Sequence, residues 1–142
     1  MPDDAAVDKA TLLADGPLSA DSLEVSLTVA DARLSAAWYR DTLGFEVFHT
    51  EREYGIVGRG ESWVHFWGPS GIEPKDSMTM FRIGVRGIDE LYSRCSEDGI
   101  VHPNAPLELK PWGFREFAVS DVDGNLVTFF EAPEGYDPRG ST

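Results

Sequence analysis

The same order of secondary-structure patterns occurs twice along the chain. Each copy has an alternating strand pattern, then a helix pattern that a glycine ends, and then three more short strand patterns. The spacing from the last valine of the strand to the glycine after the helix is 15 residues in the first copy and 14 in the second, Val29 to Gly44 and Val85 to Gly99. An internal repeat of β-α-β-β-β units constrains the fold more than any single motif does.

The two helix patterns have recognisable starts and apolar faces. Asp31 is a suitable N-cap for the first helix, and Leu34, Ala37 and Trp38 are expected to form its apolar stripe. The second helix pattern places apolar residues at i, i+3, i+4 and i+7: Ile88, Leu91, Tyr92 and Cys95. Because Cys95 lies in this stripe, it is expected to pack in the core and not to act as a nucleophile.

The repeat divides the chain into two modules and three connecting or terminal segments. We expect a flexible leader at 1–21, modules at 22–69 and 78–133, a linker at 70–77 and a tail at 134–142.

This pattern predicts an α+β fold with two packed sheets. One helix covers one face of each sheet, so the other faces need a partner, and two curved sheets together form an open cup. The cup is expected to be lined by alternate residues of the first strand of each module: Glu24, Ser26, Thr28, Met80, Arg82 and Gly84. Their mixed chemistry is typical of a binding cavity and not of a sealed core.

The charge balance excludes some partners. Twelve Lys and Arg against 25 Asp and Glu give a net charge of −13, which repels nucleic acid and anionic membranes and attracts cationic ligands. An acidic cytosolic protein with no cationic ligand would show the same balance. One cysteine, the lack of a long apolar run and the lack of a secretory signal pattern predict a cytoplasmic protein.

Four stretches, two of which overlap at DVDGN, carry a family resemblance over residues 22–133. VADARLSAAWYRDTLGF and DVDGNLVTFFE resemble the vicinal-oxygen-chelate superfamily, which includes glyoxalase I, extradiol dioxygenases, and fosfomycin- and bleomycin-resistance proteins. VRGIDELYSRCSE followed by PWGFREFAVSDVDGN is most similar to the bleomycin-resistance proteins. The chain departs from that pattern by an extra Phe114 and by Val122 in place of a proline.

The resemblance also tests for a metal site. Enzymes of this superfamily place His, Gln or Glu ligands at four cup positions, which correspond here to Glu24, His65, Met80 and Thr128. Only Glu24 and His65 are suitable ligands for Zn, Ni, Mn or Fe, and a catalytic site normally keeps three protein ligands. Glu131 is expected on the opposite sheet face from Thr128, since an odd shift along a strand reverses the side chain. We therefore expect no catalytic metal and no other cofactor.

Aromatic residues offer a different kind of site. Trp112 lies between Pro111 and Gly113 in an expected loop, and the resemblance implies that a tryptophan in this segment lines a ligand groove at a dimer interface. An indole attracts planar cationic rings by about 0.5–2 kcal/mol per contact. The predicted ligand-binding residues are Trp112, Phe114, Arg82, Glu24, Ser26, Met80, Thr128, Phe130 and Trp67.

Arg82 opposes a cationic ligand. Its guanidinium would repel such a ligand, pair with Glu24 across the cup, or hold an anionic ligand.

Two functions therefore remain open. The first is a homodimeric binding protein that sequesters bleomycin or another planar cationic compound without catalysis. The second is a metal-dependent enzyme of glyoxalase I or dioxygenase type that uses Glu24 and His65. A small-molecule sensor or an isomerase cannot be separated from these by sequence.

Overall fold

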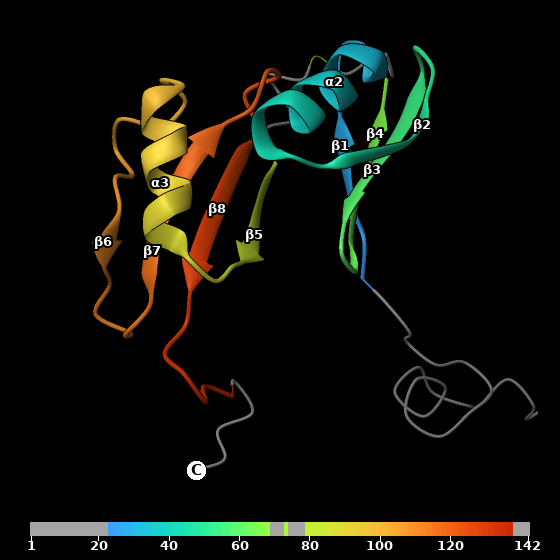
Figure 1. Ribbon diagram of the computed structural model, residues 1–142. Coiled ribbons are helices and arrows are strands. Elements are labelled where there is room, and N and C mark those ends of the chain that lie inside the picture. Colours follow the sequence, from blue (N-terminus) through green and yellow to red (C-terminus); the bar gives the residue numbers. More distant parts are fainter. Residues whose placement is uncertain (1–22, 69–72, 74–78, 138–142) are drawn as a thin grey trace, which may run out of the picture.

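The computed structural model describes residues 23–68, 73 and 79–137, and element labels follow Figure 1. The first module contains β1 (Val25–Thr28), α2 (Ala32–Leu43), β2 (Glu46–Thr50), β3 (Tyr54–Arg59) and β4 (Ser62–Trp67). The second contains β5 (Met80–Gly84), α3 (Ile88–Glu97), β6 (Glu108–Leu109), β7 (Arg115–Ser120) and β8 (Leu126–Glu131). The expected tandem β-α-β-β-β repeat is confirmed. The expected leader, most of the linker and the end of the tail lie outside the described residues.

Each module forms one mixed four-stranded sheet. The strand orders are β1-β4-β3-β2 and β5-β8-β7-β6, so equivalent strands occupy equivalent places in the two sheets. The first strand of each module pairs in parallel with the last, and the other pairs are antiparallel. Figure 1 shows the sheets side by side, with α2 against the first and α3 against the second. The α+β class is confirmed.

Helix α2 has the expected ends but a different buried face. Asp31 caps its start by accepting a hydrogen bond from the Arg33 amide, and Gly44 ends it at a φ of 77°. The predicted stripe was wrong at Leu34, which is 64% exposed. The buried face instead consists of Ala32, Ser35, Ala36, Tyr39 and Leu43. The hydroxyl groups of Ser35 and Tyr39 donate hydrogen bonds to the second module, so their side of the helix faces inward. Leu34 lies on the outer side, and its apolar side chain cannot make such a contact.

Helix α3 has the expected stripe and an unexpected cap. Ile88 and Cys95 are buried, and Leu91 and Tyr92 are half-buried against the core. Gly87 at the N-cap offers no side chain, and the carboxylate of Glu131 accepts the hydrogen bond of the Ile88 amide at 3.0 Å instead. Glu131 thus lies on the helix side of its sheet, as predicted, and its charge suits a helix N-terminus.

The turn after β7 forms hydrogen bonds that connect the second module to the first. The carboxylate of Asp121 accepts a 2.7 Å hydrogen bond from the Tyr39 hydroxyl, and that of Asp123 accepts a 2.6 Å bond from the Ser35 hydroxyl and a 3.1 Å bond from the Ala30 amide. Burial raises the pKa of Asp121, although bonds from Tyr39, Asn125 and the backbone act in the other direction. Burial and the nearby Asp121 raise the pKa of Tyr39. The DVDGN sequence is therefore an intermodule joint.

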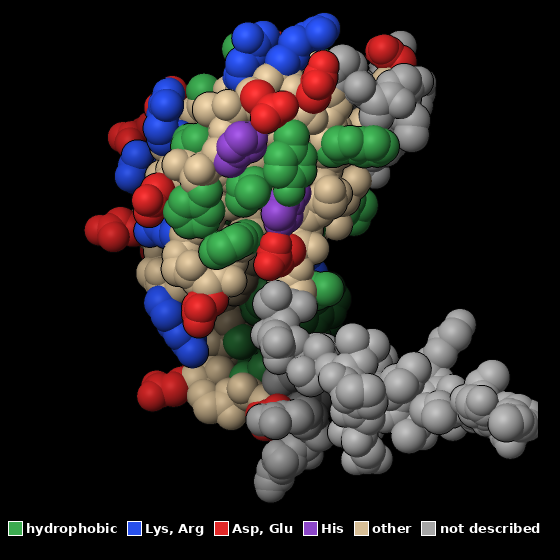
Figure 2. All heavy atoms as spheres, turned by 90° about the vertical axis from the view of Figure 1, so that its right-hand side faces the viewer, with side chains coloured by type: hydrophobic (Ala, Val, Ile, Leu, Met, Phe, Trp, Pro, Cys, Tyr) green, Lys and Arg blue, Asp and Glu red, His purple; other side chains and the backbone are tan. Residues whose placement is uncertain are grey.

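Both sheets leave one face free of helices. Figure 2 shows the right-hand side of Figure 1, where hydrophobic and histidine side chains gather over the first sheet. We call this the first open face, and by strand register it carries Ser26, Tyr54, Trp63, His65 and Trp67 together with Glu24 before β1. The second open face lies on the other sheet and carries Met80, Arg82, Glu116, Ala118, Thr128 and Phe130. None of the helices in the described residues is long and apolar enough to span a membrane.

Candidate functional site

The second open face is organised around a buried carboxylate. Glu116 is only 5% exposed, although it lies on the helix-free side of β7. One carboxylate oxygen accepts hydrogen bonds from the guanidinium of Arg82 at 2.7 Å and from the indole of Trp112 at 2.8 Å. A second bond from Arg82, at 3.3 Å, reaches the other oxygen. Glu116 therefore holds both the cation and the indole in place.

The ionisation of Glu116 follows from these contacts. Burial alone would raise the pKa of this carboxyl, but the hydrogen bonds from Arg82 and Trp112 outweigh it and hold the pKa below its usual value. The carboxylate is thus charged at neutral pH, and the Arg82–Glu116 pair has no net charge. The positive charge of Arg82, which would repel a cationic ligand, is therefore neutralised by Glu116.

Aromatic rings continue this surface beside the ion pair. The guanidinium carbon of Arg82 lies 4.7 Å from the centre of the Phe130 ring. Phe114 stacks on Phe130 with centroids 5.5 Å apart and an interplanar angle of 12°, and Tyr136 packs edge-on to Phe114. Gly84 allows this arrangement, because a Cβ atom there would lie 3.0 Å from the Phe130 ring.

Trp112 projects from the turn that joins β6 to β7. The turn closes with a hydrogen bond from the Gly113 amide to the Lys110 carbonyl, and Gly113 adopts a φ of 93° that favours glycine. The indole is tied to Glu116 through its N–H, yet the residue remains 60% exposed. A fixed, exposed ring of this kind can stack on a planar ligand with little loss of side-chain entropy.

The first open face contains a hydrogen-bonded chain of three polar side chains. The Tyr54 hydroxyl bonds to Nδ1 of His65, and Nε2 of His65 bonds to the carboxylate of Glu24. Both ring nitrogens of His65 are therefore engaged. Around this chain lie exposed aromatic residues, Trp67 at 54% exposure and the Trp63–Phe48 pair with centroids 5.2 Å apart.

The four metal positions do not form a metal cradle. Glu24 and His65 are together, but they already bond to each other. Met80 is a thioether in an exposed position, and Thr128 pairs across strands with Arg82 and Ala118. Over residues 23–68 and 79–137 no three His, Cys, Asp or Glu side chains are grouped to hold an ion. Two donors at most do not fit the three-ligand site of a catalytic divalent metal.

The predicted binding residues thus divide between the two open faces. Arg82, Met80, Phe114, Thr128, Phe130 and Trp112 belong to the second module, and Glu24, Ser26 and Trp67 belong to the first. The suggested pairing of Arg82 with Glu24 is not what the structure shows, because Arg82 pairs with Glu116 and Glu24 with His65. Each of these two pairs forms within one module.

Sequence reasoning did not find the roles of two residues of the site. The strand alternation in REFAVSD puts Glu116 on the same face as Ala118, but it does not reveal that Trp112 and Arg82 cover it. Tyr54 was not considered, although its register opposite Trp67 places it on the first open face.

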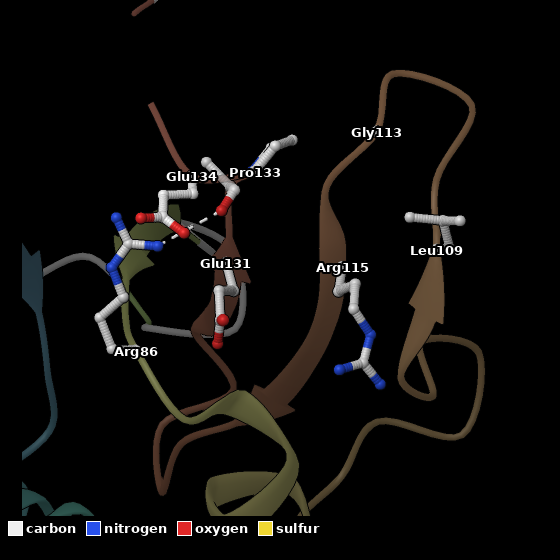
Figure 3. Close-up of a pocket in the computed structure, with 8 residues that line it drawn as sticks. Arg86, Leu109, Gly113, Arg115, Glu131, Pro133 and Glu134 are labelled. Atoms are coloured by element: carbon white, nitrogen blue, oxygen red, sulfur yellow. Dashed lines mark hydrogen bonds between the residues drawn. The ribbon is translucent and has the colours of Figure 1, made fainter. Parts of the chain in front are cut away.

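A hollow of about 550 Å³ lies on the other side of the second sheet, near the end of β8 (Figure 3). Arg86, Arg115 and Glu131 border it, but each has a partner: the Ala132 carbonyl, the Asp89 carboxylate and the Ile88 amide. These groups fix the end of the sheet and the start of α3, so the hollow is not the candidate site.

Comparison with known proteins agrees with this geometry. The family model of the "Glyoxalase/Bleomycin resistance protein/Dioxygenase superfamily" matches residues 22–129. The chain belongs to this superfamily.

Within the superfamily, the similar proteins include bleomycin-resistance and bleomycin-binding proteins. A bleomycin resistance protein of Geobacillus stearothermophilus is 36% identical over 122 residues, which span 75% of this chain and 92% of the relative. The crystal structure of the bleomycin-binding protein from bleomycin-producing Streptomyces verticillus, complexed with copper(II)-bleomycin, matches with a TM-score of 0.68 and 28% identity over 82% of this chain and 99% of that one. A lactoylglutathione lyase from Agrobacterium tumefaciens shares the fold, with a TM-score of 0.64 and 23% identity over 81% and 95% of the two chains.

Proposed function

We propose that this superfamily member sequesters a planar, cationic compound of the bleomycin type, without changing it chemically. The observation that carries the proposal is Trp112, held exposed over the second open face by a buried Glu116 that also neutralises Arg82. The name of the 36% identical relative and the copper(II)-bleomycin complex of the structural neighbour support the choice of ligand.

Charge favours such a ligand at long and short range. The net charge of −13 draws cations toward the protein, and this attraction weakens as salt screens it. At the surface, the neutral Arg82–Glu116 pair removes the local repulsion, and the rings of Trp112, Phe114 and Phe130 offer stacking partners. A planar cation gains about 0.5–2 kcal/mol from each such ring.

We further propose that two copies of the chain build the binding groove. Each open face exposes large hydrophobic side chains, Trp63 and Trp67 on the first and Met80 on the second, with Trp112 beside it. Exposed large apolar side chains that share one face are typical of protein and ligand interfaces. A groove needs two walls, and the first open face of one copy opposite the second open face of its partner supplies both. In a twofold-symmetric homodimer this pairing of a first with a second open face occurs twice, so both open faces of each copy are used.

Titration of the purified protein with metal-free bleomycin, followed by tryptophan fluorescence at low salt, tests the proposed ligand. We expect saturable quenching in the micromolar range or below, weaker binding at high salt, and a loss of about 2- to 30-fold in affinity for Trp112→Ala. Leu34→Ala is the control, since Leu34 is exposed on α2 and lies on neither open face. No quenching at micromolar ligand in low salt would rule out bleomycin.

The alternative is a metal-dependent enzyme of the same superfamily, for which the Glu24–His65 pair and the lactoylglutathione lyase neighbour are the relevant observations. Even with two chains facing each other, the four positions would supply Glu24 and His65 from one copy and Met80 and Thr128 from the other. A stoichiometric divalent ion in protein purified without chelators would favour the enzyme over the binding protein.

A further inference from the structure

A second cavity lies between the modules, away from both open faces. It has a volume of about 760 Å³, within the range of small-molecule sites. Its floor is apolar and comes from both modules, with Leu43 and Phe45 from the end of α2 and Ile83, Cys95 and Phe129 from the second module. We call it the intermodule cavity.

The rim of the intermodule cavity carries an excess of positive charge. Arg59, Arg86 and Arg94 border it, against one carboxylate, that of Glu90. This is unusual in a chain with 12 basic and 25 acidic residues, where a surface cavity would be expected to carry negative charge. Arg59 and Arg94 are exposed at this rim, whereas the guanidinium of Arg86 is directed toward the hollow at the end of β8 and lies beside Glu134 (Figure 3). Arg59 and Arg94 are therefore the groups that can reach a bound molecule.

Within the described part of the chain, Arg59 and Arg94 form no ion pair with a carboxylate. Arg59 donates to the carbonyl of Leu43 at 3.2 Å, and Arg86 donates to that of Ala132 at 3.4 Å. Arg94 has neither a hydrogen bond nor an ion pair from its side chain to another residue in the described ranges. A carbonyl accepts a hydrogen bond without neutralising the cation, and a guanidinium presents several donors in a fork that matches planar oxyanions.

We propose that the intermodule cavity binds a small amphipathic anion, with a carboxylate or phosphate head at the arginines and an apolar body on the floor beneath. This site is separate from the groove proposed above, prefers the opposite charge and does not depend on it. The apolar floor selects for an aliphatic or aromatic body, and the cavity volume limits that body to the size of a small molecule.

Octanoate is the first probe, titrated into the ¹⁵N-labelled full-length protein and followed by amide and indole NMR signals. We expect the amides of Gly44, Gly87 and Leu91, which border the cavity, to shift in a saturable way. The indole signals of Trp63 and Trp112, on or beside the open faces, should not shift. The affinity of octyl phosphate, compared with that of octanoate, shows whether the site prefers a phosphate or a carboxylate head group. Octyltrimethylammonium is the control for charge, because it has the same tail with a positive head group.

Two variants test the role of charge. Arg94→Gln should weaken octanoate binding by about two- to fivefold, and Arg94→Glu by about tenfold or more. Arg40→Glu makes the same change in net charge on the surface of α2, where Arg40 pairs with Asp41 and does not border the cavity, and should leave the affinity unchanged. The amide spectrum of Arg94→Glu, which should keep the signal dispersion of the unmodified protein, shows whether the variant folds.

The proposal is overturned if octanoate and octyl phosphate leave the three amides unshifted. It is also overturned if octyltrimethylammonium shifts them equally, or if Arg40→Glu weakens octanoate as much as Arg94→Glu does.

Discussion

Replacing Tyr39 by phenylalanine should weaken the joint between the two modules. Tyr39 is fully buried on α2, and its hydroxyl donates a 2.7 Å hydrogen bond to the carboxylate of Asp121, which is 7% exposed. Phenylalanine keeps the ring contacts with Trp38, Phe45 and Phe66 and removes only that bond. The substitution therefore isolates a single contact between the modules.

The size of the effect follows from the charge of the acceptor. A hydrogen bond to a charged group contributes about 1.5–3 kcal/mol, and one between neutral groups contributes about 1 kcal/mol. Asp121 keeps a second bond to the same oxygen, from the side chain of Asn125 at 3.1 Å, so the variant does not leave it without a partner. We expect a loss of about 2 kcal/mol at pH 7, which for a chain of this length lowers Tm by roughly 6–8 °C.

The loss should also depend on pH. Burial raises the pKa of Asp121 in the folded protein, so this carboxyl favours folding at low pH, and that contribution is lost as the pH rises through the folded pKa. The Tyr39 bond opposes the shift by stabilising the carboxylate. Without it the folded pKa rises further, and the difference between the variant and the unmodified protein is therefore largest where Asp121 is ionised. It should fall to about 1 kcal/mol in acid, where the carboxyl is protonated.

Urea unfolding at fixed protein concentration, from pH 7 down into the acid range, measures both effects. Tyr92→Phe is the matched control: Tyr92 is half-buried on α3, packs edge-on to Phe117, and its hydroxyl has no hydrogen bond to another described residue. It should change stability by less than about 0.5 kcal/mol. A Tyr39→Phe loss that equals the control, or that does not change with pH, would refute the role given to the Asp121 joint.

Two further predictions concern Glu116 and Cys95. Glu116→Gln keeps the shape of the side chain but leaves Arg82 as an uncompensated cation beside Trp112, so affinity for bleomycin should fall about tenfold. The free energy of unfolding should fall by about 1.5–3 kcal/mol, because the buried acceptor loses its charge. Unchanged affinity would contradict the neutralising role of the carboxylate. Cys95 is buried, and burial raises the pKa of its thiol to about 11, so at pH 8 a thiol reagent should react with it at the rate of unfolding. Fast labelling of the folded protein would contradict the burial of this thiol.

The repeat made the fold predictable, while the site depends on contacts that no local pattern shows. Alternation along β1 and β5 places Ser26 and Arg82 correctly, because strand periodicity alone decides the face. The face of α2 was misjudged at Leu34, because hydrogen bonds of Ser35 and Tyr39 to another module determine which side is buried. A hydropathy pattern along the helix carries no information about hydrogen bonds between modules.

The same limit applies to the ion pairs. Arg82 and Glu116 are 34 residues apart, and Glu24 and His65 are 41 apart, so their pairing depends on strand register across the sheet. The exposure of Trp112 was predictable from its place between proline and glycine. The hydrogen bond from Trp112 to Glu116 was not predictable, because it depends on the geometry of the turn between β6 and β7.

The dimeric groove is tested most directly by mixing two defective chains. Trp67→Ala removes an aromatic residue from the first open face, and Trp112→Ala removes the one beside the second. Each variant alone should bind bleomycin weakly. When equal amounts are unfolded and refolded together, mixed dimers have one groove with both defects and one with neither, so about a quarter of all grooves should recover full affinity. No recovery, with both variants folded, would show that the groove is built within a single chain.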